Sequence, residues 1–156
     1  MRYLTSMILV LSSLVVFADD WPQHLGLQRT GISQETGLVS QWPKAGLDIK
    51  WRSAGGAGMS GVAIQDSLVV TLVQKEGQQF VLALDRNSGV MKWETVVAPA
   101  FRNAMGNGPR AHPLCADGKV FVFTGEGILA AVNLADGKLI WKVDTVGQLK
   151  GRIADY

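Results

Sequence analysis

The sequence contains little cysteine, little histidine and no excess of one charge. Its 156 residues include one cysteine, Cys115, so an internal disulfide and sites built from several cysteines are both excluded. The histidines His24 and His112 stand 88 residues apart (112 − 24) with no cysteine pair beside them, which argues against a zinc site. Fifteen basic and thirteen acidic residues give a net charge of +2 without any run of Lys or Arg. Nucleic acid is therefore not an expected partner.

Helical periodicity and long apolar runs are also scarce. No sustained 3.6-residue repeat appears beyond the N-terminus, and no later run reaches the ~20 apolar residues that a transmembrane helix needs. The chain is nevertheless 47% hydrophobic and 18% charged, a composition that argues against intrinsic disorder. A length close to ~150 residues favours one domain.

Residues 1–18, MRYLTSMILVLSSLVVFA, have the layout of a secretory signal peptide. Arg2 supplies the positive end, an apolar stretch follows, and Ala18 ends a cleavage site just before an acidic pair. We expect export to the periplasm or the extracellular space, with an uncleaved N-terminal anchor as the alternative. No cysteine follows the apolar stretch, so no lipid anchor is expected.

Two segments of the sequence repeat each other. Residues 83–93 (ALDRNSGVMKW) and 131–141 (AVNLADGKLIW) align at an offset of 48 (141 − 93), and the apolar runs before them align at an offset of 51 (117 − 66). The first copy is therefore three residues longer, and the extra length falls in the polar turn 74–79. The shared positions are Ala83, Asp85, Gly89 and Trp93 in the first copy and Ala131, Asn133, Gly137 and Trp141 in the second.

Each copy predicts four short antiparallel strands. The β-branched and aromatic runs are of strand length, and Asp, Asn and Gly residues between them indicate tight turns. The expected strands are 62–64, 68–73, 80–84 and 90–93 in the first copy and 113–115, 120–123, 128–132 and 138–141 in the second. Four strands in 45 to 50 residues are typical of one β-propeller blade. The predicted fold class is all-β, an incomplete propeller of about two to two and a half blades.

The repeated tryptophan has a physical explanation in such a fold. A Trp at the end of a blade's last strand can lie flat between neighbouring blades and donate its indole N–H to a backbone carbonyl. The ring then needs a small residue and a glycine nearby, which the repeated Ala and Gly supply. The alternative is that Trp93 and Trp141 are ordinary core aromatics.

The pattern Ala-Leu-Asp-x-x-x-Gly-x-x-x-Trp resembles the tryptophan-docking repeat of the pyrroloquinoline quinone (PQQ)-like β-propellers. That group includes quinoprotein alcohol dehydrogenases and outer-membrane assembly factor B-type scaffolds. The segment 20–43, with Trp21-Pro22 and Trp42-Pro43, is similar to the start of secreted members. The resemblance covers residues 20 to about 145. It implies an N-terminal segment at 19–50 and repeats at 51–156, with blades at about 60–96 and 111–145 and a truncated third blade. Family propellers close with seven or eight blades, so the chain is expected to be an N-terminal fragment.

The resemblance implies no catalytic set in this chain. Enzyme members of the group use PQQ, a bound Ca²⁺ and in many cases an adjacent cysteine pair, whereas Cys115 stands alone. The acidic residues Asp66, Asp85, Asp117 and Asp136 fall at turns that the repeat itself requires. Residues 56–61 match G-x-G-x-x-G, but a β-rich run follows where a nucleotide site needs a helix. We expect no catalytic, cofactor-binding or metal-binding residue and no cofactor.

The segment 101–112 is the most irregular connection and is expected to join the two blades. Its candidate binding residues are Arg102, Asn103, Arg110 and His112, which could bind an anion or a peptide carboxylate. A solvated connector is the alternative.

Three functions stay open from the sequence. The first is a non-enzymatic scaffold that binds a protein partner or other propeller blades. The second is the N-terminal part of a PQQ-dependent dehydrogenase, with PQQ and Ca²⁺ bound by residues further along. The third is a truncated gene product without a function.

Overall fold

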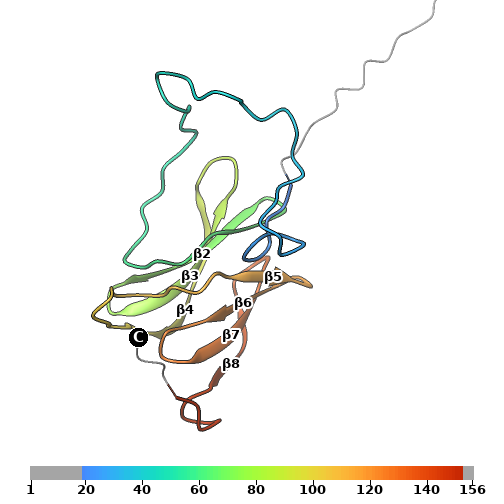
Figure 1. Ribbon diagram of the computed structural model, residues 1–156. Coiled ribbons are helices and arrows are strands. Elements are labelled where there is room, and N and C mark those ends of the chain that lie inside the picture. The colour runs from blue at the N-terminus through green and yellow to red at the C-terminus, as the bar shows by residue number, and fades with distance from the viewer. Residues whose placement is uncertain (1–18, 153–156) are drawn as a thin grey trace, which may run out of the picture.

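The computed structural model describes residues 19–152, and all regular structure in that range is β-sheet (Figure 1). Two four-stranded antiparallel sheets are present, and each strand pairs only with its neighbours in sequence. The first sheet contains β1 (Ala63–Gln65), β2 (Leu68–Lys75), β3 (Gln78–Asp85) and β4 (Met91–Pro99). The second contains β5 (Leu114–Ala116), β6 (Lys119–Phe123), β7 (Ile128–Asn133) and β8 (Leu139–Asp144). The predicted fold class is confirmed as an unclosed propeller of about two blades.

The extra length of the first copy lies at the tip of one hairpin. Strands β2 and β3 stay paired as far as Lys75 and Gln78, and the turn between them uses Glu76 (φ 50°) and Gly77 (φ 74°). Two successive residues in the left-handed region are typical of a tight β-hairpin turn. The equivalent strands of the second sheet are shorter, so the first hairpin projects further (Figure 1).

Both sheets have the same register and the same irregularity. The repeated alanine lies opposite the repeated tryptophan, Ala83 opposite Trp93 and Ala131 opposite Trp141. The register shifts immediately after this pair in both sheets. A bulge bends a strand and increases its twist. The repeat in the sequence is therefore also a repeat in backbone geometry.

One apolar core joins the two sheets. Val70, Val81 and Val97 of the first sheet and Val120 and Val132 of the second are completely buried in the same cluster. Val70 and Val120 alternate with more exposed neighbours in β2 and β6, as period-2 patterning predicts, whereas β3 is buried continuously from Gln79 to Leu84. Burial of this shared core holds the sheets face to face.

The N-terminal segment begins by bonding to both sheets. The backbone of Trp21 exchanges two hydrogen bonds of 2.9 Å with Ile64 of β1, and the carbonyl of Pro22 accepts one of 2.8 Å from Cys115 of β5. Residues 36–50 are exposed and form the long arch seen in Figure 1. Among residues 19–152, no helix is long and apolar enough to cross a membrane. The predicted signal peptide, and residues 153–156 of the predicted third blade, lie outside the described residues.

Candidate functional site

The first sheet docks onto the second through one tryptophan. Nε1 of Trp93 donates a hydrogen bond of 3.0 Å to the carbonyl oxygen of Leu134. The ring lies so close to Gly137 that an added Cβ would stand 2.5 Å from the ring atom Cε3. Gly137 also has a φ of 72°, so glycine is required there by both space and backbone conformation.

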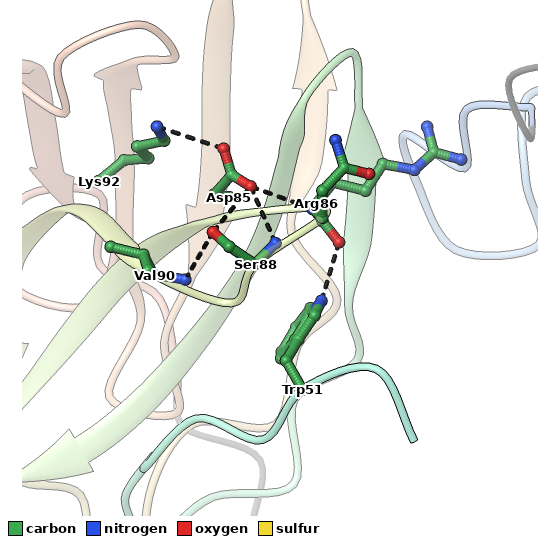
Figure 2. Close-up of polar contacts among 7 residues, drawn as sticks. Trp51, Asp85, Arg86, Ser88, Val90 and Lys92 are labelled. Carbon is green, nitrogen blue, oxygen red and sulfur yellow. Dashed lines mark hydrogen bonds and ion pairs between the residues drawn. The ribbon is translucent and has the colours of Figure 1, made fainter. Parts of the chain in front are cut away.

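The same contact recurs before the first sheet. Nε1 of Trp51 donates to the carbonyl oxygen of Arg86 at 2.9 Å (Figure 2). The Trp51 ring covers Gly89, where an added Cβ would stand 2.4 Å from Cε3. Each glycine is therefore covered by the tryptophan of the preceding unit, not by the one in its own repeat. Trp141 is the next member of this series and is 38% exposed.

The repeated Asp or Asn organises the turn under each tryptophan. Oδ1 of Asp85 accepts hydrogen bonds from the backbone N–H groups of Asn87 (3.1 Å) and Ser88 (3.0 Å), as Figure 2 shows. The pKa of Asp85 is lowered to about 2. The hydrogen bond from the Ser88 backbone contributes most to this shift, followed by the bonds from the Ser88 hydroxyl and from Lys92. Asn133 holds the equivalent turn of the second sheet, where its amide oxygen accepts a hydrogen bond from the backbone N–H of Ala135 at 2.8 Å. The repeat thus needs a side-chain acceptor, not a charge.

The predicted binding residues of the segment 101–112 do not lie together. Asn103 and Arg110 line one pocket. Arg102 is exposed and does not line that pocket. His112 lies at a different place, beside His24 of the N-terminal segment, with 5.7 Å between ring centroids. The sequence-based set of four is therefore divided among three environments.

The pocket has a volume of about 290 Å³ and lies at the end of the second sheet where β6 turns into β7, beside the segment that connects the two sheets. Its walls come from three segments: the connection before β5, the turn after β6 and the segment after β8. The lining residues are Phe101, Asn103, Arg110, Ala111, Phe123, Thr124, Gly125, Gly127, Thr145, Val146 and Arg152.

Arg110 is held in place on this pocket by its own loop. Its Nη2 donates a 2.7 Å hydrogen bond to the carbonyl oxygen of Gly106, and its guanidinium carbon lies 5.1 Å from the ring centroid of Phe101. A cation over an aromatic face at this distance is attracted by the ring quadrupole. The buried Nε of Arg110 has no hydrogen-bond partner among the described residues.

Phe101 is a residue that sequence reasoning missed. Its ring lies against Gly125, where an added Cβ would stand 2.6 Å from Cε1. The backbone N–H of Phe101 donates to the side-chain oxygen of Gln74 in β2 at 2.6 Å. The available signal was the Gly-x-Gly turn at 125–127, which allows such a close approach.

His112 and Cys115 are both shifted in pKa by burial. Burial lowers the pKa of His112, and the charge of His24 lowers it further, while the Val62 backbone acts in the opposite direction. Burial raises the pKa of the Cys115 thiol to about 11. A thiol with such a pKa and 4% exposure is a packing residue, because the reactive species is the thiolate. Among residues 19–152, no three metal-ligating side chains come together.

The sequence family described as outer membrane protein assembly factor BamB matches residues 30–154. The chain belongs to this family. The match spans both sheets and most of the N-terminal segment. No curated protein matches the sequence. The expected PQQ-like repeat is thereby confirmed.

Three solved structures resemble the chain, and the first of them shares its fold. Quinohemoprotein alcohol dehydrogenase from Comamonas testosteroni superposes with a TM-score of 0.52 at 18% identity, covering 83% of this chain and 20% of its own. BamB from Moraxella catarrhalis gives 0.38 at 26% identity, with 60% and 24% covered. A europium-containing methanol dehydrogenase gives 0.41 at 24% identity, with 53% and 14% covered. The chain thus spans a quarter or less of the length of these structures.

Proposed function

We propose that this member of the BamB family is an exported, non-enzymatic scaffold, and that the pocket lined by Arg110 and Phe101 contacts a protein partner. The observation that carries the proposal is the fixed Arg110, stacked on Phe101 at a pocket beside the turn between β6 and β7. Arginine and aromatic side chains are enriched at the energetic centres of protein interfaces. The family description, an assembly factor, agrees with a role in binding proteins.

The lining and the volume of the pocket also suit contact with a protein partner. Phe123 lines it and is 46% exposed, so an apolar side chain is available to a partner. Its volume of about 290 Å³ lies at the lower end of small-molecule sites, which hold ~300–1,000 Å³. A pocket of this size fits one or two side chains of a partner.

Site-specific photo-cross-linking in the native host tests the proposal. A benzophenone amino acid would replace Phe123 at the pocket, or, as a control, Val90 in the turn between β3 and β4 of the first sheet. Val90 is a matched position because it is 61% exposed and apolar. We expect a discrete protein adduct from position 123 and none from position 90. No adduct at position 123, or the same adducts from both positions, would overturn the proposal.

A further inference from the structure

We propose that the pocket lined by Arg110 and Phe101 binds a carboxylate of an extended peptide, and that Arg110 pairs with it. The inference rests on the proposed protein-binding function and names the chemistry of the partner. A carboxylate can come from an acidic side chain or from a C-terminus, and the test below separates these sources.

The charge of the lining residues favours an anionic group. Arg110 and Arg152 both line the pocket, and no Asp or Glu among residues 19–152 does so. A guanidinium presents planar donors that match the two oxygens of a carboxylate. Partial enclosure strengthens the attraction, because less solvent lies between the charges.

Arg110 is prepared for such a partner. The bond from Nη2 to Gly106 and the stacking on Phe101 fix the guanidinium before any ligand arrives. Its buried Nε lacks an acceptor among the described residues, which is an unfavourable state for an N–H donor. A carboxylate that enters the pocket meets a guanidinium that is already held, so little side-chain entropy is lost on binding.

Two neutral side chains that line the pocket with Arg110 keep hydrogen-bond donors available for a ligand. Oδ1 of Asn103 accepts from the N–H of Met105 at 2.8 Å, so its NH₂ group is the part left for a ligand. Oγ1 of Thr124 accepts from the N–H of Ile128 at 3.0 Å, which leaves its hydroxyl proton to be donated. Both oxygens are engaged within the fold, and the groups left over are donors. The pocket therefore offers a carboxylate three kinds of donor.

The apolar part of the pocket favours a peptide over a free inorganic anion. Phe101, Phe123 and Val146 line it beside the polar groups. An extended peptide can place a carboxylate at Arg110 and an apolar side chain against Phe123. A small hydrated anion gains nothing from these walls.

Calorimetric titration of the purified chain with three peptides tests the inference. The peptides share the sequence Gly-Gly-Phe-Xaa-Gly-Gly: Xaa is Glu with both ends blocked, Gln with both ends blocked, or Gln with a free C-terminus. We expect at least one carboxylate peptide to bind about tenfold more tightly than the doubly blocked Gln peptide. Tighter binding of the first identifies an acidic side chain as the source, and tighter binding of the third identifies a C-terminus. Equal binding of all three, or no binding of either carboxylate peptide up to roughly 10 mM, would overturn the inference.

Two variants assign the effect to Arg110. Arg110→Gln should abolish the preference for the carboxylate peptide, whereas Arg102→Gln should leave it unchanged within about twofold. Arg102 is a matched control because it lies in the same segment, carries the same charge and is exposed outside the pocket. If Arg110→Gln disturbs its loop, the comparison of Glu and Gln peptides on the unaltered chain still decides the question.

The result of the peptide titration can be distinguished from the result of the cross-linking experiment. Adducts from position 123 together with no carboxylate preference would reject the carboxylate and retain protein binding. A carboxylate preference without adducts would reject the partner in the host and retain the chemistry of the pocket.

Discussion

The indole Nε1 of Trp93 donates a hydrogen bond to the carbonyl oxygen of Leu134 at 3.0 Å, and this bond links the last strand of one sheet to a turn of the next. The bond from Trp51 to Arg86 has the same geometry one unit earlier. Arg86 and Leu134 both follow the repeated Asp or Asn directly. The repeat therefore encodes contacts between successive units.

Replacing Trp93 tests the value of this hydrogen bond. Trp93→Phe keeps an aromatic ring but removes the N–H donor, so we expect a loss of about 1 kcal/mol in the free energy of unfolding. Trp141→Phe is the control, because no hydrogen bond of the Trp141 indole is found within residues 19–152 and the side chain is 38% exposed. Urea denaturation followed by circular dichroism measures both. Equal losses in the two variants would contradict the account.

The Asp85 turn predicts an acid-sensitive contribution to stability. The folded-state pKa of Asp85 is about 2, below its ordinary value of 3.8, so the ionised form is favoured in the folded chain. The resulting stability is present above pH 3.8 and is lost as the pH falls toward 2. Asp85→Asn keeps the oxygen acceptor, as Asn133 does, and should remove this part of the pH dependence. Denaturation curves between pH 2 and pH 5 would show the difference; an unchanged pH profile in the variant would refute it.

Much of the architecture could be predicted from the sequence, because strand periodicity and turn residues are local signals. The strands around Val70 and Val120 followed from β-branched runs, and the turn before Gly89 from its Asp and Gly. Strand β4 was predicted to end at Trp93 but continues to Pro99, since the long partner strand β3 keeps offering backbone groups to pair with.

The candidate site could be predicted only in part. The segment 101–112 was correctly placed between the two sheets, but its path depends on long-range contacts. Gly106 and Gly108 have φ values of 131° and 89°, and Pro109 accepts a 2.8 Å hydrogen bond from Met59, far away in sequence. These contacts send Arg110 to the pocket and His112 to the N-terminal segment. Local patterns contain no information about that division.

His112 predicts a second pH dependence, near neutrality. Its folded-state pKa is lowered, so the neutral imidazole is favoured and the unfolded chain binds the proton more readily. Stability is therefore complete above the ordinary value of 6.5 and falls as the pH drops through 6.5 toward the lowered folded-state pKa. His24→Gln removes one of the two causes and should move the His112 titration upward. The chain has two histidines, so NMR titration of the ring protons follows each one. A His112 titration that is unchanged by the His24 substitution would contradict the coupling.

Cys115 is predicted to be unreactive in the folded chain. Its pKa of about 11 and its burial at 4% exposure keep the thiolate scarce and inaccessible at pH 8. A thiol reagent should label the chain rapidly in urea and only slowly without it. Equally rapid labelling of the folded chain would show that β5 opens freely, against the packing described above.

The docking of one sheet on the other is the central claim, and substituting two glycines tests it most directly. Gly137 (φ 72°) lies under Trp93, whereas Gly118 (φ 69°) has nothing within 4 Å of an added Cβ. Alanine strains the backbone equally at both positions, by about 1–2 kcal/mol. The difference between the variants therefore reports the contacts of Gly137 with Trp93 and, at 3.0 Å from the added Cβ, with Thr95 Oγ1 of the same strand. We expect Gly137→Ala to lower the free energy of unfolding by about 1–3 kcal/mol more than Gly118→Ala, the cost of overpacking. Equal losses in the two variants would show that Trp93 does not hold the sheets together.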